Sequence, residues 1–184
     1  AMSLGLDLRG GVHFLLEVDM NAVTAMAVDR YYNELRAALR KDKLYKKIRK
    51  EDDLLFVSFK SEALKNEAKK VIKEDLPDLV VAEGSEQELE IGLEISAAAQ
   101  ADAKNGALKQ NITTLRNRVN ELGVAEPIIQ QQGTERIVVQ LPGVQDTARA
   151  KEILGAVATI EFRMVDEKND VQTAIQSGKT PTGS

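Results

Sequence analysis

The segment RNRVNELGVAEPIIQQQGTERIVVQLPG, residues 116–143, decides the fold because it contains a helix end, a turn and a complete hairpin in succession. Gly123 is placed to end the helix, since glycine adopts the left-handed conformation without a Cβ clash, and Pro127 prevents any continuation. A strand pattern begins at Ile128, and Gly133 predicts the turn of a hairpin. The second strand of this hairpin alternates between two sets of residues: Ile137, Val139 and Leu141, and Arg136, Val138 and Gln140.

A long helix leads into this segment. Its apolar residues recur at steps of three and four, which places them on one face that another layer must cover. They are Leu108, Ile112, Leu115, Val119 and Leu122. The helix begins in the alanine-rich stretch after Ser96, and Gly106 weakens it by about 1 kcal/mol relative to alanine.

The remaining elements follow from caps, periodicity and turn residues. Residues 12–18 alternate as a strand entered through the flexible pair Gly10 and Gly11. Asp19 or Asn21 caps a helix that runs to about residue 40, and Ser61 caps a second helix that ends before Pro77. Further strands are expected at residues 44–50, 54–59, 79–82, 89–95 and 157–165, and a short helix starts after Asp146.

Composition excludes several classes of function. The chain has 184 residues, no cysteine and a single histidine, His13, so no disulfide, thiolate site or Ser-His-Asp set is available. No phosphate-binding or dinucleotide-binding glycine pattern occurs, and no apolar run approaches the roughly 20 residues that span a bilayer. A net charge of −4 with 4% aromatic residues argues against a nucleic-acid partner. We therefore expect no enzyme activity, no catalytic residues, no cofactor and no metal.

Three blocks of this sequence together resemble the first periplasmic domain of the SecD family. They are LGLDLRGGVHFLLEVD at residues 4–19, NRVNELGVAEPIIQQQGTERIVVQLPG at 117–143 and DTARAKEILGAVATIEFRMV at 146–165. The resemblance implies a fragment of a multi-pass inner-membrane protein, on the periplasmic face of the bacterial membrane. It further implies an accessory subunit of the Sec translocon, in the resistance-nodulation-division (RND) superfamily, that works with SecF and the channel in proton-driven preprotein translocation. The fragment would be the base or hinge below a polypeptide-binding head, and would itself bind unfolded preprotein weakly.

The order of elements predicts an α+β fold with two ferredoxin-like units, each a split β-α-β-β-α-β arrangement with an antiparallel sheet. The expected units are residues 4–95 and 96–166, and residues 167–184 form a polar tail that links to the head. Strand 12–18 can belong to either of the two sheets. It opens the first unit or, as in shorter members of the family, it belongs to the second sheet, in which case residues 20–94 form an insertion.

Three groups of residues are candidate sites, although each has a purely structural interpretation as well. The first is a hinge motif where the chain leaves the membrane, formed by Leu4, Gly5, Leu6, Asp7, Leu8, Arg9, Gly10 and Gly11. The second is the helix-turn-hairpin motif, formed by Arg116, Asn117, Arg118, Asn120, Gly123, Glu126, Pro127 and Gly133. The third, a patch for an anionic partner or a solvated hairpin edge, contains Lys43, Lys46, Lys47, Arg49 and Lys50.

A second function class is compatible with the same fold. Paired ferredoxin-like units often bind small molecules, and a regulatory module of that kind would need a convergent polar pocket. The sequence offers for it only the Asn and Gln content of residues 111–132.

Overall fold

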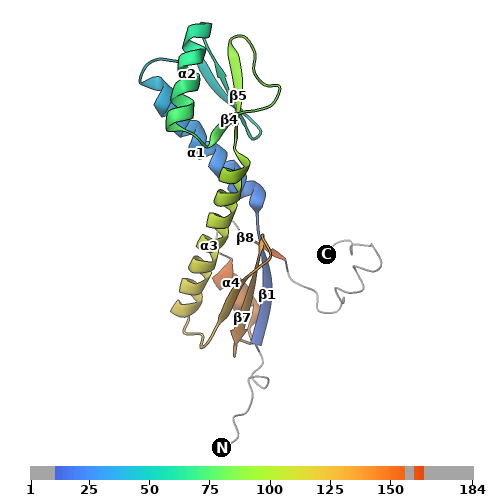
Figure 1. Cartoon of the computed structure of the whole chain (residues 1–184). Coiled ribbons are helices and arrows are strands. Elements are labelled where there is room, and N and C mark those ends of the chain that lie inside the picture. The colour runs from blue at the N-terminus through green and yellow to red at the C-terminus, as the bar shows by residue number, and fades with distance from the viewer. Residues whose placement is uncertain (1–10, 156–159, 164–184) are drawn as a thin grey trace, which may run out of the picture. The chain divides into compact units, whose positions relative to one another are not determined.

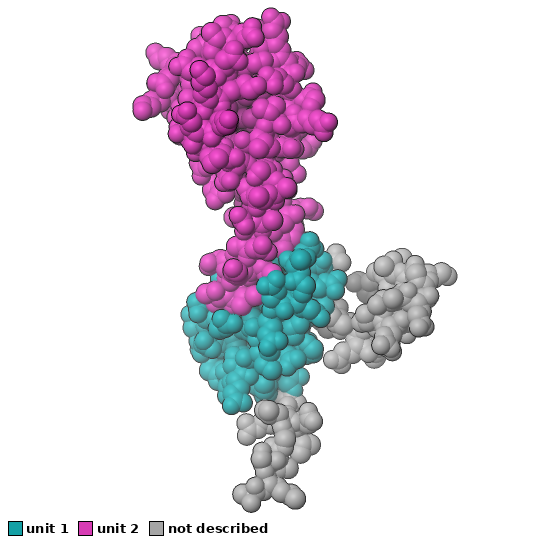
Figure 2. All heavy atoms as spheres, in the orientation of Figure 1, with its two compact units in different colours: residues 1–18, 114–184 teal, residues 19–113 magenta. Residues whose placement is uncertain are grey.

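The structure, a computed structural model, describes residues 11–155 and 160–163. The chain forms two compact units, of which unit 1 contains residues 1–18 and 114–184 and unit 2 contains residues 19–113 (Figure 2). The division therefore lies at residue 18 and inside helix α3 (Ala97–Glu121), and the boundary expected at residues 95 and 96 is corrected. Helix α3 continues through Gly106 without interruption. Its first part belongs to unit 2, and the part from residue 114 onward belongs to unit 1.

Unit 1 is built on a four-stranded antiparallel sheet (Figure 1). Its spatial order is β6 (Ile128–Gln132), β7 (Arg136–Pro142), β1 (Gly11–Val18) and β8 (Ile160–Arg163). Helix α3 follows β1 in this unit and α4 (Thr147–Leu154) follows β7, which gives the β-α-β-β-α-β sequence of a ferredoxin-like fold. Strand β1 pairs with β7 and with β8, so residues 12–18 lie in the sheet of unit 1.

Unit 2 has the second four-stranded antiparallel sheet. Its spatial order is β2 (Lys47–Glu51), β3 (Leu54–Ser58), β5 (Glu90–Ile95) and β4 (Leu79–Val81). Helices α1 (Met20–Arg40) and α2 (Glu62–Asp75) pack against each other and against this sheet. Strand β5 is the last strand of unit 2 in chain order, but it occupies the interior position, next to the edge strand β4, that β1 has next to β8 in unit 1. Unit 2 is therefore a circularly permuted ferredoxin-like arrangement, and the fold class predicted from sequence is confirmed.

The helix starts are fixed by the caps that the sequence predicts. The carboxylate of Asp19 accepts from the Ala22 amide at 3.0 Å, and the Ser61 hydroxyl accepts from the Leu64 amide at 3.4 Å. Asp146 accepts from two amides of the first turn of α4 at 3.0 and 3.2 Å. Each cap satisfies amides that have no partner within their own helix, and so sets where the helix begins.

The cores form from the alternating and helical apolar positions, with two departures from expectation. Leu108, Leu115 and Val119 of the α3 stripe are buried, but Leu122 is 37% exposed because the helix ends one residue before it. Leu89 is 41% exposed, since β5 begins only after it. Residues 157–159 and 164–165 of the expected closing strand lie outside the described residues.

Candidate functional site

The described residues contain no cluster of side chains placed to bind a metal ion. No group of three or more His, Asp or Glu side chains among residues 11–155 and 160–163 is placed to hold a metal ion. Within the same residues, no helix has the length and apolar character needed to cross a membrane. The candidate sites are therefore surfaces and structural motifs.

Gly11 is the one residue of the expected hinge motif that the structure describes, since residues 4–10 lie outside the described part. It opens β1 opposite Pro142 of β7. A Cβ added at this position would lie 2.9 Å from the carbonyl oxygen of Leu141 and 3.1 Å from the Cα of Pro142. Both neighbours are backbone atoms that cannot rotate away, so the close approach of β1 and β7 requires glycine here.

The helix-turn-hairpin motif holds two glycines in the left-handed conformation, which the sequence predicts for Gly123. Gly123 has φ +68° and Gly133 has φ +65°, the first at the end of α3 and the second in the hairpin turn. The Gly123 amide donates to the carbonyl of Asn120 at 3.0 Å, which closes the last turn of the helix. Glu126 also has a positive φ, of 50°, immediately before Pro127, which the sequence did not predict.

The polar side chains of this motif lie at its surface. Arg116, Asn117, Asn120 and Glu126 are exposed, whereas Arg118 and Pro127 are half-buried. None of these six residues lines the pocket that lies at the same corner of unit 1. A shallow pocket of about 290 Å³ lies at this corner of unit 1 and is lined by Leu122, Val124, Leu141, Gly143, Val144, Gln145, Asp146, Arg149 and Ala150.

The five basic residues of the expected patch do not form one free positive surface. Arg49 forms ion pairs with Glu51 and, at 2.8 Å, with Glu90, and its guanidinium lies 4.3 Å from the centroid of the Phe56 ring. The hydrogen bond to Glu51, followed by the one to Glu90, raises the pKa of Arg49. Lys50 pairs with Asp29 of α1. Of the five residues, Lys43, Lys46 and Lys47 form no ion pair with the described part of the chain, and all three are exposed.

Two family models match the segments of the chain that form the sheet of unit 1. The family described as "Protein translocase subunit SecDF, P1 domain, N-terminal" matches residues 108–167, and the "SecD/SecF GG Motif" matches residues 2–22. The two matched segments are far apart in the chain, yet β1 from one pairs with β7 and β8 from the other. The chain is 48% identical to "Protein translocase subunit SecD" of Escherichia coli (strain K12) over 186 residues, which is 100% of this chain and 30% of that protein.

The chain belongs to the SecD family. The SecD of Pseudomonas aeruginosa is 42% identical over 96% of this chain and 29% of its own length, and that of Syntrophobacter fumaroxidans is 35% identical over 98% and 35%. The chain thus spans about a third of the length of the curated relatives that it matches. These relatives share unit 2 as well, since their similarity extends over nearly the whole chain.

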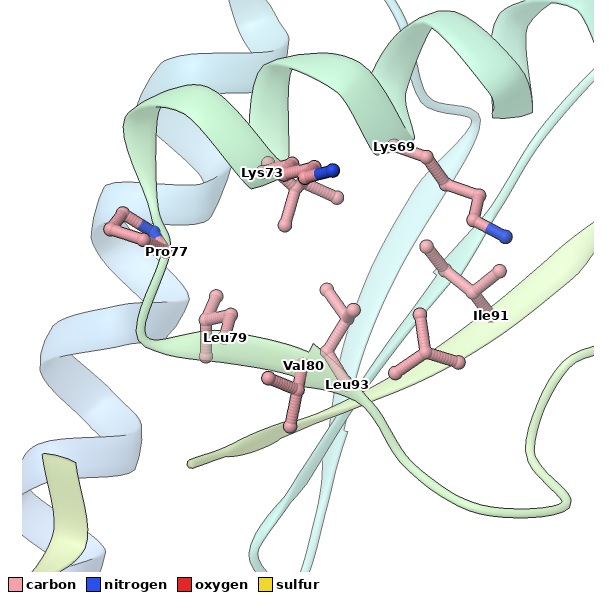
Figure 3. A pocket seen from close by; sticks show the side chains of 9 residues that line it. Lys69, Lys73, Pro77, Leu79, Val80, Ile91 and Leu93 are labelled. Carbon is pink, nitrogen blue, oxygen red and sulfur yellow. The ribbon is translucent and has the colours of Figure 1, made fainter. Parts of the chain in front are cut away.

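Within this SecD-family chain, the structure forms a groove in unit 2 that sequence reasoning missed. It lies between the second half of α2 and the edge strand β4 and has a volume of about 420 Å³ (Figure 3). Its floor and walls are apolar, and two lysines stand on its α2 side. The lining residues are Lys69, Ile72, Lys73, Pro77, Leu79, Val80, Val81, Ile91 and Leu93. Little in the sequence points to this groove, because its residues come from α2, β4, β5 and the turn at Pro77, and the valines of β4 were expected in an ordinary strand.

Two lysines of α2, Lys65 and Lys69, form hydrogen bonds and ion pairs with the loop that follows β4. Lys65 is only 7% exposed, and its Nζ donates to the Gln87 carbonyl at 2.9 Å and lies 3.2 Å from a Glu86 carboxylate oxygen. Lys69 donates to the same carboxylate at 2.9 Å. The hydrogen bonds from Lys69 and then Lys65 lower the pKa of Glu86. The cluster ties α2 to the loop, and a buried lysine on an otherwise apolar helix face was not predicted.

Proposed function

We propose that this chain is the supporting base of a SecD protein that assists preprotein translocation at the periplasmic face of the bacterial inner membrane. The name of its relatives, protein translocase subunit, supports the transport part of the proposal. The observation that carries the structural part is the central position of β1. The strand that follows the GG motif pairs with β7 on one side and β8 on the other.

The pairing register suggests how such a base would transmit movement. Gly11 begins β1 opposite the end of β7, and Arg163 at the end of β8 pairs with Leu15. Because β1 and β8 are antiparallel neighbours, the chain enters β1 and leaves β8 at the same end of the sheet. In the proposed arrangement, one connection comes from a membrane segment and the other leads towards a head. A displacement of either would pass to the other through the hydrogen bonds between two adjacent strands.

The finer parts of the proposal follow from the family. SecF and the Sec translocon channel are the proposed partners, and the proton gradient is the proposed energy source. The chain itself would support and hinge a head that holds the preprotein. A small-molecule regulatory role finds no comparable support, because the Asn and Gln side chains around the α3 corner do not converge on a pocket.

An export assay tests the supporting role in the full-length SecD protein that carries this chain, expressed in bacteria depleted of their own SecD. The test variant is Gly11→Ala, which forces a methyl group against the backbone of β7. The matched control is Gly106→Ala, where an added Cβ meets no atom within 4 Å. We expect Gly11→Ala to slow export of a reporter preprotein at equal protein level and Gly106→Ala to leave it unchanged. Wild-type export by Gly11→Ala would contradict a role for the β1 pairing.

Photo-crosslinking separates support from direct handling of the preprotein. Probes at Val138 and Gln140 in β7 of unit 1, used during arrested export, should give no crosslinks to the preprotein, whereas probes in the head should. Crosslinks from β7 as strong as those from the head would show that unit 1 handles the preprotein directly.

A further inference from the structure

We infer that the groove between α2 and β4 binds an extended segment of a partner protein, which adds to the β4 edge and carries an apolar residue and an acidic residue on the same face. This goes beyond the proposed function, which gives the chain a supporting role and assigns no ligand to unit 2. Every residue of the groove belongs to unit 2, so the inference stands or falls independently of the role of the β1 pairing.

The edge of β4 is chemically unlike the opposite edge of the same sheet. The order β2-β3-β5-β4 leaves β2 and β4 as the two edge strands. Strand β2 carries charged side chains at four of its five positions, which discourage pairing with another chain. Strand β4 instead presents Val80 at 40% exposure and Val81 at 37%. An edge strand with exposed β-branched residues and no charge is suited to accept another strand.

The hydrogen bonds of β4 show which backbone groups face outward. The Ser96 amide donates to the Asp78 carbonyl at 2.8 Å, and the Ala82 amide donates to the Gly92 carbonyl at 2.9 Å. Since the bonding direction alternates along an antiparallel strand, the N–H and C=O of Val81 point away from β5. These groups lie beside the groove and can pair with the main chain of an added strand, as in other cases of β-strand addition.

The groove determines what side chains the added strand would carry. Ile72, Leu79 and Leu93 give it an apolar lining that favours an aliphatic side chain. Lys73 stands at the rim and forms no ion pair in the described part of the chain, whereas Lys69 is already paired with Glu86 (Figure 3). A carboxylate on the incoming segment complements the charge of Lys73. Side chains on the same face of a strand are two residues apart, so the expected pattern is an apolar residue and an acidic residue at positions i and i+2.

The short edge limits the strength of binding. Strand β4 has three residues, which gives an added strand roughly 10 Å of contact at about 3.3 Å per residue. Few main-chain hydrogen bonds and one apolar side chain predict weak, rapidly reversible binding, with a dissociation constant on the order of 1 mM. Such binding tolerates many sequences that share the pattern.

The test is a titration of the isotope-labelled full chain with the capped peptide acetyl-TITET-amide, followed by amide NMR. We expect saturable shifts in β4 and the second half of α2. Two N-methylated peptides, one modified at the second and fourth residues and one at the third, should differ, because only alternate amides of an added strand face β4. One pattern should abolish binding and the other should keep it. Equal binding by both, or shifts that centre elsewhere, would overturn the inference.

A pair of lysine variants tests the acidic residue. Lys73→Glu should weaken binding of TITET about threefold or more and should improve binding of TITKT, the same peptide with lysine in place of glutamate. Lys70 is exposed on the same helix but lies outside the groove, so Lys70→Glu should change neither affinity by as much as twofold. Equal effects of the two variants would mean that only the net charge of the helix matters, and the charge part of the inference would fail.

Discussion

Replacing Lys65 with methionine should destabilise unit 2 more than the same change at Lys69, although both lysines contact Glu86. Methionine keeps most of the buried stem of lysine, so packing changes little and the difference reports the ammonium group. At Lys65 the ammonium is buried and donates to the Gln87 carbonyl at 2.9 Å. At Lys69 the side chain is 36% exposed, and its only ion-pair partner in the described part is Glu86.

The magnitude follows from these surroundings. A hydrogen bond from a charged donor contributes about 1.5–3 kcal/mol, but removing the ammonium also removes the cost of burying it. Glu86 is 43% exposed, so its carboxylate is resolvated rather than left buried without a partner. We therefore expect Lys65→Met to lower the free energy of unfolding by about 1–2 kcal/mol. The exposed pair at Lys69 should contribute less than the buried contact of Lys65, because water solvates both of its partners.

Urea denaturation of the full chain measures both variants, with the amide signals of Ile91 and Leu93 as probes of unit 2. Added salt separates the two effects, since 1 M salt screens the exposed Lys69 pair and leaves the buried Lys65 contact nearly unchanged. If Lys65→Met were no more destabilising than Lys69→Met, or were stabilising, burial of the ammonium would cost as much as its contacts return. The view of Lys65 as a fastening between α2 and the loop would then be refuted.

Two further predictions concern stability. Gly11→Ala should lower the free energy of unfolding of unit 1 by about 1–3 kcal/mol, because the added Cβ would lie 2.9 Å from the Leu141 carbonyl oxygen. Urea denaturation followed through the amide of Val139 measures this change. An unchanged denaturation midpoint would contradict the prediction. Glu86 has a lowered pKa in the folded chain, so its contribution is fully present above the ordinary glutamate value of 4.5 and is lost as the pH falls through the lower, folded value. The midpoint difference between wild type and Glu86→Gln should accordingly be present at pH 6 and shrink as the pH falls below 4.5. A difference that persists unchanged at acid pH would exclude the carboxylate as its source.

Local signals in the sequence were sufficient for most of the secondary structure. Asp19, Ser61 and Asp146 cap their helices as predicted, and Gly123 and Gly133 have the positive φ that their turns require. These features depend on residues within a few positions of one another, so the chain specifies them wherever the segment is placed. The requirement for glycine at position 11 is different, because it depends on a contact with the backbone of β7, far along the chain. Local sequence alone therefore does not specify it.

The candidate surfaces were less accessible to sequence reasoning. The basic run is evident in the sequence, but only the tertiary structure brings Asp29 to Lys50 and Glu90 to Arg49 and so neutralises part of it. The groove beside β4 and the burial of Lys65 left little signal in the sequence. An edge strand has the same local sequence pattern as an interior strand, and a buried lysine has the same local pattern as a solvated one.

Short-range periodicity and backbone preference specify the helices, the hairpins, the caps and the α+β class, so these features can be predicted from the sequence. The position of strand β1 cannot, because it depends on contacts between distant segments. Its buried residues, Phe14, Leu16 and Val18, alternate in a way that fits either sheet. The choice depends on which distant strands offer complementary edges, and β7 and β8 do so in unit 1, while β5 already fills the central position in unit 2.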